Sequence, residues 1–323
     1  MNQAVLKKCL FEARLLLLAC AATLFSFCWL RVWIVSRLEM SSFASIIEKL
    51  WDKWKDFSPV PLSQLLSYSG RIAVGYDEPI VVFSVAIFAI ARGSDAVSGE
   101  LGRGTMEMLL AQPISRLQVL YSQALVTIVA LLLLSLAAWG GTYAGIQTNN
   151  VTEEAPAPSL RIPGLGIEIP LSFKPGRTIT VPMRERVSAM DLLPGAVNLF
   201  SFGVCWAGLA TLVSACDRYR WRTIGIVSSF FVLQMIMKIA GLAVDWLRPL
   251  LSLSIFTAYE PQKFVSIAVN MPEQTWALLL RDSDGRVIDT GPLGYNLILL
   301  GIGLAAYLLA GAIFHNRDLP APL

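Results

Sequence analysis

Six long apolar segments constrain what this chain can fold into more than any other feature of its sequence. A hydrocarbon core about 30 Å thick is crossed by roughly 20 helical residues, and every segment reaches that length. The segments cover residues 15–35, 72–91, 117–143, 192–215, 223–244 and 293–314. Charged residues make up only 15% of the 323 residues, whereas soluble domains average about a quarter. The sequence therefore predicts an all-α polytopic membrane protein with six transmembrane helices.

Basic residues in the short loops predict the orientation of these helices. An excess of Lys and Arg in short loops marks the cytoplasmic side of a membrane, whereas long loops count little. One face holds these short-loop residues: Lys7, Lys8, Arg14, Arg92, Arg103, Arg116, Arg218, Arg220, Arg222 and Arg317. We therefore expect cytoplasmic termini in a plasma (cytoplasmic, or inner) membrane. Residues 1–14 are expected to form a separate helix on the membrane surface at this side.

The first two outer loops have different sequence patterns. Residues 36–71 contain an amphipathic helix over 42–57 with two tryptophans on its apolar face. This helix lies either in the membrane interface or against the other loops. Residues 147–191 carry six prolines, which exclude a long helix. The sequences IEIPLSF and ITVP on either side of KPGR predict a small β-hairpin in this loop.

The third outer loop covers residues 248–292. Residues 249–259 are apolar but too few to cross a membrane, so they are a candidate for a re-entrant or interfacial segment. The sequence TWALLLRDSDGRVIDTG that follows predicts a second hairpin, which turns at DSDG.

A polar segment over residues 92–118 separates the second and third apolar segments. Its centre has the pattern of a short amphipathic helix, in which Thr105 caps the start and Glu107 favours the positive end of the helix dipole. Its apolar residues share one face at i, i+3 and i+4: Met106, Leu109 and Leu110. The sequence predicts that this short helix presents a rigid surface to the water phase.

A second helix is predicted to begin soon after the first one ends. Pro113 stops the short helix. Ser115 and Gln118 have the spacing of a capping box, and Ile114 and Val119 have the spacing of the accompanying hydrophobic staple. The third apolar segment therefore starts as a capped helix.

The sequence SGELGRGTMEMLLAQPISR in this segment resembles the loop of ABC-2-type transporter permeases. The family pattern is an acidic residue, a basic residue, GT, E, LL, and then P-hydrophobic-SR. The matching residues, in order, are Glu100, Arg103, Gly104, Thr105, Glu107, Leu109, Leu110, Pro113, Ser115 and Arg116. The ending FHNRDLPAP is also similar to the C-terminus of this family. The proline-rich loop of residues 147–191 departs from it, so a substrate does not carry over.

The resemblance implies a single transmembrane permease domain over residues 1–323. It also implies that residues 92–116 form a coupling loop whose helix docks on an ABC ATPase subunit. ATP and Mg are then expected on that partner, and a second permease subunit, identical or different, completes a dimer. The expected function is that of a membrane-spanning subunit of an ATP-driven transporter, an exporter, in the lipid bilayer.

The residue types present in the chain do not predict catalytic chemistry of its own. The sequence has no G-x-x-x-x-G-K-[ST] loop to hold nucleotide phosphates, so ATP hydrolysis is expected on a separate chain. The only histidine is His315, which leaves metal and Ser/His constellations without their usual residues. The sequence has no basic stripe with interleaved aromatic residues, so nothing in it indicates binding of nucleic acid. We expect no enzyme activity and no cofactor, metal or nucleic acid on this chain.

Charged and apolar residues of the loop suggest how an ATPase would be recognised. Glu100, Arg103 and Glu107 are expected to meet charges on its surface, where paired charges set register. Met106 and its apolar neighbours would otherwise form an exposed apolar patch. The alternative is a solvated polar loop whose patch lies on lipid headgroups.

Three charged residues fall inside the apolar segments. Asp77 and Glu78 lie about 14 residues from Arg92, and Lys238 lies 16 residues from Arg222, so their depths of about 21 and 24 Å agree. Charges within a bilayer are costly unless they are paired or face water. The hypothesis is that Lys238 pairs with Asp77 or Glu78. The alternative is that both spans start lower and all three side chains are wet.

Two other functions remain open from the sequence. A membrane scaffold or sensor would bind a partner through the outer loops and use residues 92–116 as a cytoplasmic docking site. A membrane-embedded enzyme would need a nucleophile with a base, and the sequence offers no such set.

Overall fold

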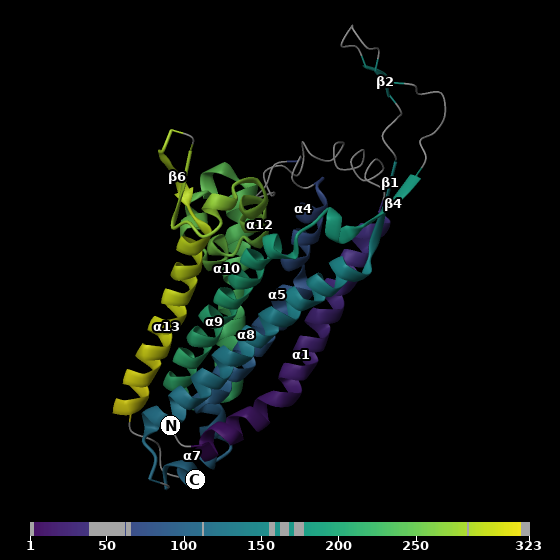
Figure 1. Cartoon of the computed structure of the whole chain (residues 1–323). Coiled ribbons are helices and arrows are strands. Elements are labelled where there is room, and N and C mark those ends of the chain that lie inside the picture. The colour runs from purple at the N-terminus through teal and green to yellow at the C-terminus, as the bar shows by residue number, and fades with distance from the viewer. Residues whose placement is uncertain are drawn as a thin grey trace.

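The computed structural model describes residues 3–38, 62, 66–111, 113–154, 159–161, 168–170, 178–282 and 284–317. Six helical stretches are long and apolar enough to cross a membrane, which confirms the predicted all-α polytopic fold. Figure 1 shows them side by side in one elongated bundle, with the described chain beginning and ending near α7. The predicted amphipathic helix over residues 42–57 lies outside the described residues.

Five of the spans are single helices. They are α1 (Gln3–Arg37), α8 (Arg116–Thr148), α9 (Leu193–Cys216), α10 (Arg220–Ala243) and α13 (Pro292–Asn316). The separate surface helix expected over residues 1–14 is instead continuous with the first span. No Gly or Pro occurs between Gln3 and Arg37, so nothing in the sequence interrupts the backbone hydrogen bonds.

The second span is interrupted. Its pieces are α4 (Tyr68–Ala73), the 3-10 helix η2 (Val74–Tyr76), α5 (Pro79–Ser94), the π-helix η3 (Asp95–Gly99) and α6 (Glu100–Gly102). The break falls at Asp77 and Glu78, because Pro79 has no N–H to continue the helix and instead occupies the first turn of α5. Past Arg92, where a polar loop was expected to start, the span stays helical to Gly102.

Helix α9 lies at the centre of the bundle, against α5 and α13. Its Phe202 and Trp206 are completely buried, and the ring of Trp206 lies 4.7 Å from that of Phe231 on α10. The remaining face of α10 and much of α1 expose large apolar side chains. Such surfaces are typical of helices that face lipid or a further chain.

Short strands form three two-stranded antiparallel sheets in the described outer loops. β1 (Asn150–Glu154) pairs with β4 (Thr178–Pro182), and β2 (Ser159–Arg161) pairs with β3 (Glu168–Pro170). The sequence had suggested that the two segments around KPGR pair with each other. This prediction was wrong, because each of them pairs with a different strand. The reason is topological: β1 leaves α8 and β4 leads toward α9 at the same end of the bundle, so these strands meet (Figure 1).

The hairpin predicted at DSDG is confirmed. β5 (Leu279–Arg281) pairs with β6 (Val287–Thr290), and Gly285 takes a positive φ of 77° in the turn. The apolar residues before it form only short pieces, α11 (Pro249–Leu253) and η7 (Ile255–Ala258). An additional helix, α12 (Pro261–Asn270), packs its apolar face on α9 and α4.

The remaining 3-10 turns connect these elements outside the long helices. They are η4 (Met183–Glu185), η5 (Ala189–Leu192), η6 (Asp245–Leu247) and η8 (Pro272–Gln274).

Candidate functional site

A short helix caps the end of the bundle between the second and third spans. This helix, α7 (Thr105–Leu110), confirms the prediction of a helix in the polar segment. Its start differs from the prediction, because Gly104 is the N-cap residue and has a φ of 70°. That left-handed conformation suits glycine and separates α6 from α7. The hydroxyl of Thr105 instead hydrogen-bonds to the Glu100 carboxylate and to its backbone oxygen.

The two faces of α7 differ from the expected ones. Met106 is only 1% exposed and packs in a cluster with Leu120 of α8 and Phe314 of α13. Met106 therefore anchors the helix and does not form part of an exposed patch. Met108, at 72% exposure, is a large apolar residue that α7 offers to its surroundings, next to the exposed Glu107.

The start of α8 confirms the predicted cap. Ser115 and Gln118 exchange side-chain and backbone hydrogen bonds as a capping box, and Pro113 lies exposed before them. Ile114 and Val119 lie in one buried cluster, as a staple requires.

Arg116 has a role inside the chain. Its guanidinium donates to backbone carbonyls at the end of α13, at 3.4 Å to Phe314 and 2.6 Å to Arg317. These carbonyls have no partner within the helix, so Arg116 satisfies them and compensates the negative helix end.

Glu100 is completely buried and already has partners. Its carboxylate lies 2.6 Å from Lys8 Nζ of α1 and 3.1 Å from Arg103 Nη2. The expectation that Glu100 meets charges on an ATPase surface is therefore not supported, since its side chain points into the molecule. Its position ties α6 and α7 to α1.

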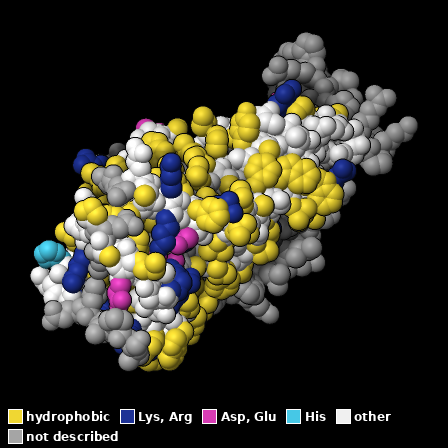
Figure 2. Space-filling model, turned by 90° about the horizontal axis from the view of Figure 1, so that it is seen from below, with side chains coloured by type: hydrophobic (Ala, Val, Ile, Leu, Met, Phe, Trp, Pro, Cys, Tyr) yellow, Lys and Arg dark blue, Asp and Glu magenta, His cyan; other side chains and the backbone are white. Residues whose placement is uncertain are grey.

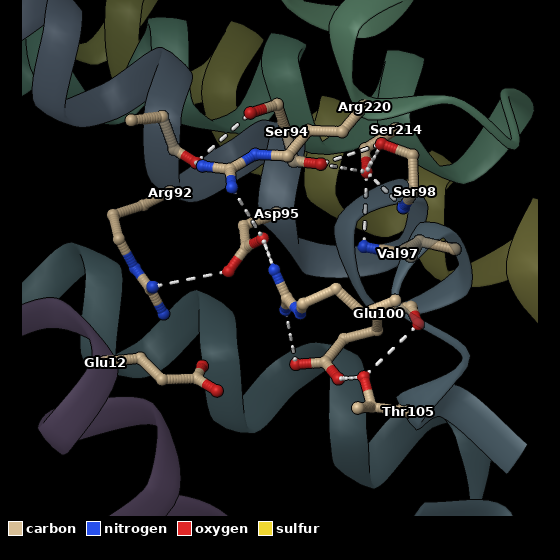
Figure 3. A network of polar contacts seen from close by, with 12 residues as sticks. Glu12, Arg92, Ser94, Asp95, Val97, Ser98, Glu100, Thr105, Ser214 and Arg220 are labelled. Atoms are coloured by element: carbon tan, nitrogen blue, oxygen red, sulfur yellow. Dashed lines mark hydrogen bonds and ion pairs between the residues drawn. The ribbon is translucent and has the colours of Figure 1, made fainter.

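Asp95 is the centre of the neighbouring contacts, which Figure 3 shows. Its carboxylate lies 2.7 Å from Arg103, 3.3 Å from Arg220 of α10 and 3.6 Å from Arg92. A Cβ at Gly99 would lie 2.1 Å from an Asp95 oxygen, so only glycine leaves room for this arrangement. The hydrogen bond to Asp95 raises the pKa of Arg103 above its ordinary value.

The convergence of these residues on Asp95 was not predicted from the sequence. The signal available was the sequence ARGSD, in which Arg92 and Asp95 are three residues apart at the end of an apolar helix. Arg220 came from a different span, and only the folded chain places it beside Asp95.

The geometry is thus a six-span bundle with a capped loop helix held by charged and apolar contacts. The sequence profile of ABC-2 family transporter proteins matches the chain over residues 32–319. The chain belongs to this family. No curated protein matches this ABC-2 family chain. Family membership makes it a membrane permease subunit, that is, a transport component that spans the membrane.

In this ABC-2 permease, Lys238 has partners other than the expected ones. Its ammonium group donates to the carbonyls of Phe256 at 2.9 Å and Tyr259 at 3.0 Å, and lies 4.0 Å from Glu260. Phe256 lies within η7 and Tyr259 is its C-cap residue, so Lys238 donates to carbonyls at the end of this short helix. Lys238 therefore ties α10 to the outer loop.

The two acidic residues at the helix break are also used separately. Glu78 lies 3.4 Å from Arg31 of α1, whereas Oδ2 of Asp77 is buried and has no hydrogen-bond partner among the described residues. No ion pair joins Lys238 to Asp77 or Glu78 within the described ranges. The hypothesised direct pair is therefore not formed, and Lys238 and Glu78 contact different parts of the chain.

Proposed function

We propose that this permease subunit belongs to an ATP-driven exporter and is coupled through α7 to a separate ABC ATPase subunit. The observation that carries the proposal is the division of α7 into an anchored face and a free face. Met106 is buried in the bundle, whereas Glu107 and Met108 point outward. An apolar side chain beside a carboxylate at the end of a membrane bundle is suited to a partner with an apolar pocket and a basic rim.

The contacts of α7 give a route for mechanical coupling. Met106 packs on α8 and α13, and Glu100 next to α7 reaches Lys8 on α1. Asp95 connects the same region to Arg220 on α10. A push on α7 would therefore act on several spans together, because helices connected by buried contacts move as units.

The nucleotide chemistry is assigned to the partner. ATP and Mg are proposed to bind the ATPase, because this chain has no phosphate-binding loop of the G-x-x-x-x-G-K-[ST] type. We propose a dimer of two permease subunits, identical or different, in the plasma membrane with cytoplasmic termini. Closure of two ATPases would then tilt the spans and open a path between the two permeases.

The test is co-purification of the chain with an ABC ATPase and measurement of its turnover. Glu107→Lys reverses the charge on the free face of α7, and we expect loss of the permease effect on turnover while the permease stays folded. Glu273→Lys is the matched control, since Glu273 is also exposed but lies in η8, beyond α12 at the other end of the bundle. Unchanged assembly and turnover in Glu107→Lys would contradict the coupling assignment. A partner that binds only through the outer loops would favour the scaffold function.

A further inference from the structure

A cavity of about 370 Å³ lies beside Asp95. Helix α1 lines it with Glu12 and Leu16, and the second span lines it with Ala91, Arg92 and Asp95. Arg103 and Arg220 complete the lining. Figure 2 views this end of the molecule, where basic and acidic side chains gather among hydrophobic ones. The cavity is therefore charged inside and has apolar surroundings.

Arg92 has unused hydrogen-bond donors at this cavity. Its side chain is 5% exposed, and its Nη1 lies 3.6 Å from Asp95. Its Nε and Nη2 are buried and have no hydrogen-bond partner among the described residues. Buried donors of a charged group are costly when they are unpaired. A ligand with several acceptor oxygens would satisfy them, and the planar guanidinium fits the paired oxygens of a phosphate.

The charges around the cavity favour an anion. Four basic and three acidic side chains form one cluster, in which each member lies within 4 Å of an oppositely charged one or lines the cavity. The basic ones are Lys8, Arg92, Arg103 and Arg220, and the acidic ones are Glu12, Asp95 and Glu100. The cluster therefore keeps an excess of one positive charge. Glu12 faces the cavity, but Lys8 lies 3.5 Å from it and offsets its charge.

An apolar track leads from the cavity along the membrane-spanning part of α5. Ile87, Phe83 and Ile80 are exposed, and with Ala91 in the cavity they follow the spacing of one helix face. Ile224, one turn after Arg220, is also exposed on the neighbouring α10. A bound molecule can thus place an acidic group in the cavity and apolar chains along the track.

We propose that this cavity binds the phosphate group of an anionic phospholipid, with Arg92 as the main phosphate contact and the acyl chains along Ile80, Phe83 and Ile87. The lipid would occupy the space between α1, α5 and α10 at the end of the bundle where α7 lies. This assignment does not depend on an ATPase, because all its residues belong to this chain.

The test is binding of a short-chain phosphatidate, dioctanoyl phosphatidic acid, to the purified full-length chain in detergent, measured by native mass spectrometry and thermal shift. We expect saturable binding, with dioctanoylglycerol and inorganic phosphate at least about tenfold weaker. Arg92→Gln should weaken phosphatidate binding about tenfold or more. Arg248→Gln is the control, since Arg248 forms an exposed pair with Asp245 after α10 and should leave binding unchanged.

A second variant keeps the test valid if Arg92→Gln fails to fold. Leu16→Trp retains every charge and fills the cavity, so it should also weaken binding about tenfold. Wild-type binding in whichever of these two variants folds would overturn the proposal. Equal binding of inorganic phosphate and phosphatidate would overturn the lipid assignment. The variant Ile87→Cys in a Cys216→Ser background tests whether a second copy of the chain covers the track. A disulfide between two such chains, together with no phosphatidate binding, would show that it does and would overturn the lipid proposal.

Discussion

The hydroxyl of Ser214 accepts a hydrogen bond from the backbone N–H of Ser98 at 2.9 Å. It also accepts one from the N–H of Val97 at 3.1 Å, and it donates to the carbonyl of Ser94 at 3.0 Å. Val97 and Ser98 belong to the π-helix η3, and all of these residues are buried. One side chain of α9 thus supplies partners to a wide turn of the second span.

We expect Ser214→Ala to destabilise the protein by about 1–3 kcal/mol, because it leaves buried N–H groups unpaired. The measurement is the thermal or denaturant unfolding midpoint of the purified chain. Ser135→Ala is the matched control: Ser135 is also buried on a long helix, but its hydroxyl has no partner in the described part of the chain. Equal effects of the two substitutions would contradict the role of Ser214.

Glu100→Gln tests whether this carboxylate is structural. We expect a loss of about 1.5–3 kcal/mol, the contribution of hydrogen bonds to a charged group, because Lys8 and Arg103 lose their shared anion. Their side chains are 32% and 41% exposed and can turn to water, which limits the cost. Glu107→Gln on the free face should stay within about 0.5 kcal/mol in the same unfolding measurement. If Glu100→Gln is as stable as the wild type but assembles differently with the ATPase, Glu100 would contact the ATPase and would not be structural.

Gly303→Ala tests the closest approach of α13 to α9. A Cβ at Gly303 would lie 2.7 Å from the backbone oxygen of Val204, so the helices must separate. We expect about 1–3 kcal/mol of destabilisation from overpacking. Gly301→Ala on the same helix meets open space and should be neutral in unfolding assays. A neutral Gly303→Ala would mean that the two backbones are further apart.

Asp289 in the β5–β6 hairpin provides a pH test. Burial favours its neutral form, but hydrogen bonds from Lys263, Thr290 and Tyr295 outweigh burial and lower the pKa of Asp289. A lowered carboxyl pKa contributes stability that is present above the unfolded value of about 3.9 and is lost as pH falls through the folded value.

The difference in unfolding temperature between wild type and Asp289→Asn should therefore be constant from neutral pH to about pH 5 and shrink below about pH 4. Arg248→Gln removes an exposed ion pair, so its unfolding temperature should differ little from that of the wild type at every pH in this range. A difference that already shrinks between pH 7 and 6 would contradict the lowered pKa.

The sequence was sufficient where the determining interactions are local. Hydropathy located the six spans, and the spacing of Ser115 and Gln118 located the start of α8, because both signals depend on neighbouring residues. The hairpin with Gly285 was also predictable, since its strands adjoin their own turn. Strand β4 was assigned the wrong partner because β1 is brought to it by α8 and α9.

The inward position of Glu100 and Met106 was not predictable for a different reason. Glu100 was expected in a polar loop, but the second span stays helical through η3 and α6 and brings it against Lys8 of α1. Met106 is buried by Leu120 of α8 and Phe314 of α13, which are distant in the sequence. The partners of Lys238 were hidden because carbonyl groups at the end of η7 have no sequence signature. Charge pairing by depth considered side chains alone and so omitted these backbone acceptors.

The π-helix η3 also makes the direction of α7 depend on chain length. A π turn accommodates one residue more than an α-helical turn, so the segment after it is rotated by about 100° relative to a regular helix. Deleting Ala96 would convert η3 to a regular turn and swing Glu100 out of its buried position. The direction in which the exposed face of α7 points thus depends on one extra residue in η3. Deleting that residue would change this direction while leaving every side chain of α7 unchanged.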